Sequence, residues 1–476
     1  MRHFEAELRH YQKDKAIPFL LDNPIVALFM DMGLGKTISV LTAVARMFLL
    51  SLLEPQDAVL VLAPLRVARG VWMQEARDWE HTQHLKVSRV LGNERQRARA
   101  LITPANIYVI NIENTQWLFR KALPQLARKL GRFPFKMLVL DESSKFKHAS
   151  TERFKAIKPH VKSFERRILL SGTPAPQGLT NLWSQYFLLD QGKRLGSAFD
   201  RYKFRFFIMV DAEGHKWEAR AGALEYISNL VRDVTVRMDA ADYLELPKLL
   251  VNPVWVDLPP QPRELYEQFE RELFLQLDTA TVEAFNAATL TGKCHQLANG
   301  AVYNDPELRR EYTIFHDEKI DALEEVLDSE QSNVLVAYNF RHDLMRIEKM
   351  VKAKFKDRRF EVFTSKGSDK MQDEWNDRKI DIMALNAQGA AHGVNIQYGG
   401  CAIAQFSLTW VNENYTQLIR RLQRSGQQSD HVRLHQIMTR DTVDEAIRRS
   451  NHHNQHLERA FLDSLNLYRA QRELLA

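Results

Sequence analysis

The feature that most constrains this chain is a glycine-containing turn between an apolar run and an apolar-periodic segment. Its three parts are residues 24–28, 29–37 and 38–53, and they predict a strand, a phosphate loop and a helix. Gly33 and Gly35 allow backbone N–H groups to curl around phosphates. Lys36 can reach the β- and γ-phosphates of a nucleotide, and the Thr37 hydroxyl can ligate Mg²⁺ at the helix N-terminus. The segment therefore predicts binding of ATP and Mg²⁺.

The loop departs from the full pattern in one place, because Met30 stands where the first glycine belongs. The alternative interpretation is a glycine-rich turn between strand and helix that carries Lys-Thr by chance. Residues further along the chain favour the phosphate loop.

A second candidate segment lies about a hundred residues downstream. Residues 135–140 are almost entirely apolar and lead into Asp141-Glu142, which predicts a buried parallel strand ending in two carboxylates. The carboxyl ends of parallel strands meet at one edge of the sheet, where a phosphate loop also lies. We therefore assign Asp141 to the metal and Glu142 to the attacking water. The alternative, an acidic helix cap, accounts for one carboxylate but not for the pair.

Motif candidates occur in a fixed order along nearly the whole chain. They are residues 8–12 (LRHYQ), 30–37, 62–65 with Trp72, Glu75 and Trp79, Asp141-Glu142 with Lys147, 170–174 (LSGTP) with 182–183, 334–338, 389–395, Trp410, 417–427 and 442–445. Together these segments resemble the Swi/Snf-type ATPases, which are helicase-like motors of superfamily two. The resemblance implies an α/β fold of two tandem, doubly wound, RecA-like lobes with one nucleotide site between them.

The resemblance also implies roles for individual residues. Gln12 would read the adenine, and Arg421 and Arg424 of the second lobe would complete catalysis across the cleft. An arginine is suited to this role because charge spreads over the γ-phosphoryl oxygens in the transition state. The alternative for both arginines is a helix face that contacts a phosphate backbone.

Nucleic-acid contacts are implied at six positions. They are Pro64, Arg66, Ser171, Thr173, Gly393 and Trp410. For the segment from Ser171 to Thr173 two roles stay open, a relay of nucleotide state and a phosphate contact, and its composition alone predicts a turn with a hydroxyl cap.

The sequence departs from the family pattern where the state of the nucleotide is passed to the nucleic acid. Ser144 and Gln423 stand where the family usually has histidines, and Ala390-Ala391 stand where it has a glycine pair. These departures concern the coupling between ATP hydrolysis and movement rather than hydrolysis itself.

Composition fits a large motor of a reducing compartment. The 476 residues are 45% hydrophobic, enough for two or more domains. Two cysteines occur, Cys294 and Cys401, so no disulfide framework is expected. Charged residues in the first segment of the sequence argue against a signal peptide. The polar residues within 38–53 argue against a membrane span. We therefore expect a cytoplasmic protein that is not bound to a membrane.

The charge balance predicts a polyanionic partner. The formal net charge is +6, with a pI near 9.1. Basic clusters occur at residues 94–99, 201–207, 352–359 and 420–424. In residues 201–207 cations alternate with aromatic rings, which suits a nucleic-acid backbone. The favoured interpretation there is nevertheless buried rings with solvated cations.

The apolar runs predict how the domains are organised. Strands are expected at 25–29, 58–63, 107–112, 136–140 and 167–171, and again at 251–258, 333–338, 360–364, 380–385, 401–406 and 432–438. The expected parts are lobe 1 at 1–235 with a helical protrusion at about 180–235, a linker at 236–250, lobe 2 at 251–440 with a helical insertion at about 262–310, and a C-terminal helical brace at 441–476.

The resemblance to the Swi/Snf-type ATPases implies an ATP-dependent translocase on double-stranded DNA that does not read sequence, with a partner protein as a candidate for targeting. One alternative within the fold is a helicase or annealing motor acting on forked DNA or RNA. An alternative of another class is a nucleotide-gated DNA-binding scaffold with poor turnover, which Ser144 and Gln423 permit. Stimulation of ATP hydrolysis by different nucleic acids separates the three.

Overall fold

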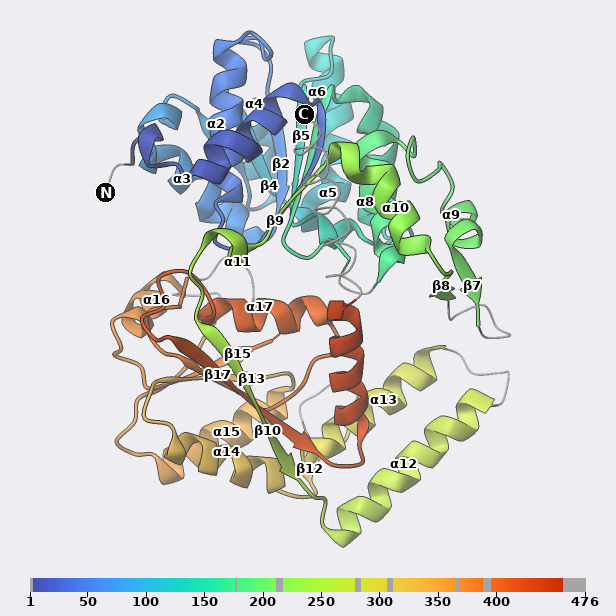
Figure 1. Cartoon of the computed structure of the whole chain (residues 1–476), viewed down its shortest axis with the longest axis vertical. Helices are drawn as coiled ribbons and strands as arrows, with labels where there is room; N and C mark the ends of the chain where they lie inside the picture. Colours follow the sequence, from blue (N-terminus) through green and yellow to red (C-terminus); the bar gives the residue numbers. More distant parts are fainter. Residues whose placement is uncertain are drawn as a thin grey trace. The chain divides into compact units, whose positions relative to one another are not determined.

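The structure is a computed structural model that divides into two compact units. It describes residues 3–175, 178–210, 217–278, 284–305, 311–364, 368–387 and 395–456. Among these, unit 1 holds residues 3–244 and 454–456, and unit 2 holds residues 245–453. Each unit is built on a parallel sheet with helices packed against it (Figure 1).

The sheet of unit 1 has seven parallel strands in the order β3-β4-β2-β5-β6-β1-β9. The strands are β1 (Ile25–Met30), β2 (Val59–Ala63), β3 (Val87–Val90), β4 (Ile107–Asn111), β5 (Met137–Asp141), β6 (Arg166–Ser171) and β9 (Thr235–Met238). Five of them confirm predicted apolar runs, whereas β3 and β9 were not predicted. The central strands β2, β4 and β5 are buried along their whole length, as expected for a parallel sheet covered on both faces.

The helices of unit 1 connect these strands. They are α1 (Ile17–Asp22), α2 (Lys36–Leu49), α3 (Trp72–Asp78), α4 (Glu94–Ile102), α5 (Thr115–Trp117), α6 (Leu123–Leu130), α7 (Glu152–Ile157), α8 (Leu182–Asp190), α9 (Phe199–Phe206), α10 (Ala223–Val231) and α11 (Ala240–Tyr243). Helix α2 confirms the helix predicted after the phosphate loop.

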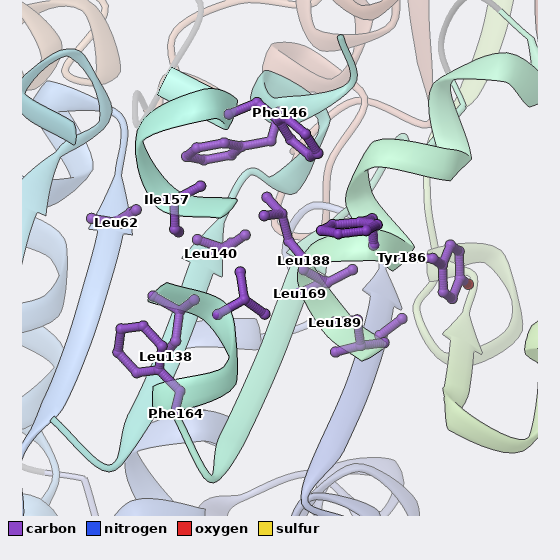
Figure 2. Close-up of a cluster of buried hydrophobic side chains, with 14 of the residues drawn as sticks. Leu62, Leu138, Leu140, Phe146, Ile157, Phe164, Leu169, Tyr186, Leu188 and Leu189 are labelled. Carbon is purple, nitrogen blue, oxygen red and sulfur yellow. The ribbon is translucent and has the colours of Figure 1, made fainter. Parts of the chain in front are cut away.

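One hydrophobic cluster holds the helices of unit 1 against the sheet. Leu140 of β5, Leu169 of β6 and Leu188 of α8 meet within it (Figure 2). Helix α8 is apolar on most of its circumference, and all nine of its residues are buried. Burial of one such leucine contributes about 1.5–3 kcal/mol, so this cluster fixes β5 and β6, whose ends carry the candidate site.

The segment expected to be a helical protrusion is only partly helical. After α8 and α9, an antiparallel hairpin forms from β7 (Phe207–Met209) and β8 (Trp217–Ala219), and the chain returns through α10 to β9. The helical expectation missed the hairpin because Phe199, Tyr202 and Phe206 lie at helical spacing and run directly into the apolar residues 207–210.

The sheet of unit 2 has six parallel strands in the order β10-β17-β16-β13-β15-β14. They are β10 (Lys248–Val256), β13 (Val334–Tyr338), β14 (Phe360–Val362), β15 (Ile382–Asn386), β16 (Ala402–Gln405) and β17 (His431–Thr439). Its helices are α12 (Pro260–Asp278), α13 (Ala284–Ala298), α14 (Glu318–Ser329), α15 (Arg341–Lys354), α16 (Ser368–Asn376) and α17 (Asn412–Leu422), and a small antiparallel pair joins β11 (Ala301–Tyr303) to β12 (Tyr312–Ile314). All six strands match predicted apolar runs.

Two expected segments end differently in the structure. The segment 236–250 contains the end of β9 and the start of β10, so residues 239–247 connect the two sheets. Of the expected brace at 441–476, residues 443–456 are helical and residues 457–476 lie outside the described part of the chain.

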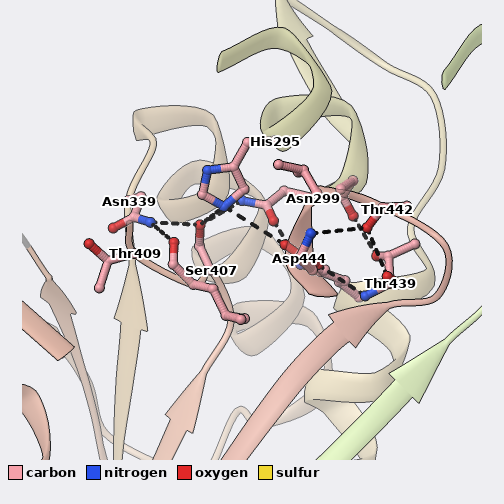
Figure 3. A network of polar contacts seen from close by, with 12 residues as sticks. His295, Asn299, Asn339, Ser407, Thr409, Thr439, Thr442 and Asp444 are labelled. Atoms are coloured by element: carbon pink, nitrogen blue, oxygen red, sulfur yellow. Dashed lines mark hydrogen bonds and ion pairs between the residues drawn. The ribbon is translucent and has the colours of Figure 1, made fainter. Parts of the chain in front are cut away.

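A buried polar network ties the helices of unit 2 to the ends of its strands (Figure 3). The Lys319 ammonium lies 2.6 Å from the Asp444 carboxylate, and both side chains are fully buried. Asn299 accepts a hydrogen bond from Lys319 and donates to Asp343 and Ser407. Buried charges are tolerated only when they are paired and hydrogen-bonded, so this network fixes α13, α14 and the helix at 443–456 relative to one another.

We predict that Lys319→Met destabilises the protein by about 3–5 kcal/mol, because it leaves Asp444 as an uncompensated buried charge. Urea unfolding followed by circular dichroism measures the effect. The control is Lys352→Met, which removes an exposed ion pair with Glu348 and should change stability by about 1 kcal/mol or less. Equal effects of the two changes would contradict the prediction.

Candidate nucleotide site

The phosphate loop joins β1 to α2 in the predicted manner. Gly33 and Gly35 adopt φ values of +88° and +75°, a region that side chains with a Cβ rarely occupy. Gly35 directly precedes α2, so the backbone N–H groups of the first helical turn are available to an anion. Met30, which replaces the first glycine of the pattern, is the last residue of β1 and is fully buried. The replacement therefore falls in the strand and leaves the two left-handed positions intact.

Lys36 lies against the loop itself. Its ammonium donates to the carbonyl oxygens of Met30 at 2.7 Å and Asp31 at 3.2 Å. These contacts hold the positive charge over the loop, where phosphate oxygens would replace carbonyl oxygens as its partners. Thr37 is half-buried in the first turn of α2, and its role as a metal ligand stays a prediction.

Gln12 contacts the same loop from a distant part of the sequence. Its side-chain nitrogen donates to the carbonyl oxygens of Leu34 and Gly35, each at 3.3 Å, and its oxygen accepts from the N–H of Arg9 at 2.9 Å. A Cβ at Gly35 would lie 2.4 Å from the Gln12 amide nitrogen, so the Gln12 side chain would have to move if Gly35 were replaced. The structure thus brings Gln12 to the phosphate loop, and its role in reading adenine stays a prediction.

Asp141 ends β5 in a buried position. The indole Nε1–H of Trp72 donates to Asp141 Oδ2 at 2.9 Å. Burial raises the pKa of the Asp141 carboxyl, while the Trp72 hydrogen bond and the positive charge of Lys36 lower it. The influence of Lys36 indicates that the loop and the carboxylate share one site. Oxygen donors such as Asp141 and Thr37 are the ligands that Mg²⁺ prefers, so the residues present fit this ion.

Glu142 follows with a strained backbone. Its φ of +63° is left-handed, which for a residue with a Cβ costs of order 1–3 kcal/mol. Glu142 Oε1 accepts hydrogen bonds from the hydroxyls of Ser144 at 3.0 Å and Ser171 at 3.2 Å. The strained turn and these two hydrogen bonds fix the orientation of the Glu142 carboxylate.

Ser171 therefore differs from its expected place on a nucleic-acid surface. It is fully buried, and its hydroxyl also accepts from the Thr173 N–H at 3.0 Å. Of the two roles left open for this segment, the burial of Ser171 and its contact with Glu142 favour the relay. A direct contact between its side chain and a nucleic acid is disfavoured.

The other residues expected to contact nucleic acid differ in exposure. Pro64 is buried, Arg66 and Thr173 are half-buried, and Trp410 of unit 2 is 39% exposed. Gly393 lies outside the described residues, as do Ala390 and Ala391. The first three lie after β2 and β6, near the carboxyl edge that carries the candidate site.

The two candidate catalytic arginines belong to unit 2. Arg421, in the last turn of α17, is 1% exposed, and Arg424, two residues beyond the helix, donates to Asn395 Oδ1 at 2.6 Å. Gln423, which replaces a family histidine, donates to the carbonyl oxygen of Pro247 at 3.1 Å. The action of both arginines on a nucleotide stays a prediction.

Besides the hydrogen bond between Ser171 and Glu142, two further contacts of the site have no signal in the sequence. The first is Trp72 with Asp141: Trp72 belongs to a motif, but nothing in the sequence assigns it a partner 69 residues away. The second links the loop to the end of the sheet, because Asp31 accepts from the N–H of Ala240 at 3.1 Å and donates its own N–H to Met238 at 3.0 Å.

The fold and the site together define a class. Two parallel-sheet units, a phosphate loop and a carboxylate pair at the carboxyl edge of the first sheet are the features of a helicase-like ATP hydrolase built from RecA-like lobes. Within this class, residues 23–306 match the model of the SNF2-related domain. The chain belongs to this family.

Several known proteins are similar to this chain. "Putative protein p41" of Acyrthosiphon pisum secondary endosymbiont phage 1 is 35% identical over 446 residues, which cover 90% of this chain and 93% of p41. "Putative ATP-dependent helicase/translocase YwqA" of Bacillus subtilis is 24% identical and matches 93% of this chain, which spans 47% of the length of YwqA. The solved structure "Sulfolobus solfataricus SWI2/SNF2 ATPase core in complex with dsDNA" aligns with a TM-score of 0.43 and 20% identity, over 94% of this chain and 91% of that chain. Within the described residues, no helix is long and apolar enough to cross a membrane.

We predict that Asp141→Asn raises the Tm of the nucleotide-free protein while abolishing ATP hydrolysis. Burial raises the folded-state pKa of Asp141 above its usual value, so the group's contribution to stability is full at acidic pH and is lost as pH rises through the folded pKa. Asparagine carries no charge to desolvate and still accepts from Trp72. Each kcal/mol recovered should raise Tm by roughly 2–4 °C.

Calorimetry from pH 4 to 8 without nucleotide tests this prediction, because the increase in Tm caused by Asp141→Asn should grow with pH. Asp357→Asn, at an exposed position, serves as the control and should leave Tm unchanged. A lower Tm for Asp141→Asn across this range would show that the charged Asp141 carboxylate does not destabilise the folded protein.

A further change, Ser171→Ala, should lower kcat about tenfold with little change in the dissociation constant for ATP, since it removes one donor that aims Glu142 but no contact with the loop. Single-turnover hydrolysis and equilibrium nucleotide binding separate the two quantities. Ser184→Ala, a buried serine of α8, is the matched control for the loss of a buried hydroxyl. A weakened affinity with unchanged kcat would rule out the positioning role.

Proposed function

We propose that this chain is an ATP-dependent translocase that moves along double-stranded DNA without reading its sequence. The observation that carries the proposal is the Glu142 carboxylate, which two buried serine hydroxyls aim at the sheet edge that also carries Lys36 and Asp141. A carboxylate held this way serves to orient a water for attack on a γ-phosphate. Membership of the SNF2-related family supports the same conclusion.

Each residue of the site has a distinct task in this mechanism. The loop N–H groups and Lys36 bind the phosphates, and Thr37 and Asp141 would hold Mg²⁺. When bound, this ion neutralises charge on the β- and γ-phosphate oxygens. Glu142 orients the attacking water and takes its proton. Hydrolysis follows because the developing negative charge meets fixed positive groups.

The second unit is proposed to complete the site only in part of the cycle. Arg421 and Arg424 would supply cations to the transition state, and a planar guanidinium in that role increases rates by ~10³–10⁵ in related chemistry. If nucleic acid favours the same closed state, its binding and ATP hydrolysis are thermodynamically linked. An alternation between open and closed states then moves the motor along its track.

Double-stranded DNA is the proposed track for two reasons. The motors that the chain resembles act on duplex DNA, and the name of the Bacillus relative includes translocase activity. The net charge of +6 suits a polyanion. Half-buried Arg66 and Thr173 and exposed Trp410 are the described candidates for contacts with the backbone.

We predict that duplex DNA stimulates steady-state ATP hydrolysis by the purified chain more strongly than single-stranded DNA or RNA does. Glu142→Gln should reduce kcat by about 10²–10⁴-fold, because the water loses its general base. Glu165→Gln, on an exposed side chain, is the control. If the chain displaces the third strand of a DNA triplex when ATP is present, it moves along the duplex.

Other outcomes would replace the proposal. Stimulation by single strands or RNA alone would favour a helicase or annealing motor. ATP-dependent binding to DNA with negligible turnover would favour a nucleotide-gated scaffold.

A further inference from the structure

An apolar patch surrounds the β7–β8 hairpin of unit 1. Five large apolar side chains on or beside the hairpin are exposed: Phe204, Ile208, Met209, Val210 and Tyr226. Arg201 and Arg205 of α9 and Arg220, which follows β8, are also exposed. We call these eight residues the hairpin patch. The hairpin extends beyond α9 and α10, away from the sheet of unit 1 (Figure 1).

The aromatic residues of this region divide between the core and the patch. Tyr202, Phe206 and Phe207 are buried and pack in the main cluster of unit 1, as the favoured interpretation of residues 201–207 predicts. Phe204 is 65% exposed and Tyr226 is 50% exposed. That interpretation is therefore correct for three of the four rings of residues 201–207 and wrong for Phe204, while Tyr226 lies outside that segment.

Both exposed rings are held in place by a neighbour. Phe204 meets the ring of Trp217 edge-on, with 5.3 Å between centroids. The Arg205 guanidinium lies over the Tyr226 ring at 5.0 Å and donates to its hydroxyl at 2.8 Å. Rings that are fixed on one side and open on the other lose little conformational entropy when a flat partner stacks on them.

The charges of the patch select the kind of partner. Within the described residues, Arg201, Arg205 and Arg220 form no ion pair with a carboxylate, so their charge is available to a polyanion. Interleaved arginines and exposed aromatic rings suit single-stranded nucleic acid, because every unpaired base offers a face for stacking and every nucleotide carries a phosphate. A purely apolar protein partner would leave these arginines desolvated without compensation.

We propose that the hairpin patch binds unpaired bases of single-stranded DNA, with Phe204 and Tyr226 stacking on bases and Arg201 and Arg205 contacting the backbone. The choice of DNA rests on the proposed translocase function. The patch would let the motor hold a displaced or gapped strand in addition to its duplex track.

Binding of a labelled oligothymidylate to the full chain, measured by fluorescence anisotropy, tests the proposal. Phe204→Ala/Tyr226→Ala should weaken binding about tenfold or more, since stacking of one base on an aromatic ring typically accounts for such a factor. The matched control is Ile102→Ala/Leu130→Ala, whose side chains are 60% and 49% exposed on α4 and α6 and whose loss should not change the affinity. Circular dichroism melting confirms that each variant is folded.

The salt dependence of the same binding tests the arginines. Arg201→Gln/Arg205→Gln should reduce the slope of log K against log salt by about 1.4, because each phosphate contact on a single strand contributes roughly 0.7. Arg128→Gln/Lys129→Gln is the control. It removes two exposed cations on a helix of unit 1 that lies outside the basic clusters, and the slope should not change.

A third measurement uses the wild-type chain and needs no substitution in the hairpin patch. Photo-crosslinking of the wild-type chain to an oligonucleotide with 5-iodouracil, followed by peptide mass spectrometry, should place the crosslink on Phe204 or Tyr226.

Three results would overturn the proposal. The wild-type chain could fail to bind oligothymidylate, or the Phe204→Ala/Tyr226→Ala variant could bind it with unchanged affinity. The third is a loss of affinity for duplex DNA in this variant that equals its loss for oligothymidylate, which would indicate a backbone contact without base stacking. Stimulation of wild-type ATP hydrolysis by duplex DNA is measured separately. The translocase proposal and the hairpin proposal can therefore fail independently.

Discussion

The rest of the nucleotide site depends on one buried carboxylate, that of Asp141. Asp141 ends a strand that is buried on both faces, and its charge is costly there. The Trp72 indole and the Lys36 ammonium offset that cost from two other elements, the first residues of α3 and α2. The three elements must therefore keep their relative positions, because a displacement of any one leaves a buried charge without its partners. The large apolar cluster around β5, β6 and α8 supplies this rigidity.

The phosphate loop is also connected to both ends of unit 1. Gln12 bonds its carbonyl oxygens from the start of the chain, and Asp31 bonds the backbone at Met238 and Ala240, where the chain leaves the sheet toward unit 2. A nucleotide that drew Lys36 from its carbonyl partners would alter the balance of contacts at this loop. The geometry thus offers a physical route by which an event at the phosphates is transmitted to the segment between the units.

Most of the strands could be predicted because their apolar runs are long and uninterrupted, as in Val59–Ala63 and Val334–Tyr338. Strands β3 and β9 could not, since an arginine interrupts each short run and no local pattern marks their sheet position. The motif residues Lys36, Asp141 and Glu142 were predictable from their chemistry and order. Their supporting contacts were not, because Trp72 with Asp141 and Ser171 with Glu142 depend on which strands become neighbours. Ser171 shows the consequence: its motif could be identified, but its burial could not.

The short connection between the two sheets has a consequence for how strongly the units need to attract each other. Strand β9 ends at Met238 and β10 begins at Lys248, so residues 239–247 are nine residues that span at most about 30 Å when extended. Tethered partners on such a scale experience an effective concentration in the millimolar range. An interaction whose dissociation constant is in the millimolar range, too weak to join two separate proteins, is about half-formed at such a concentration. The covalent connection therefore allows two units to associate reversibly without a tight interaction.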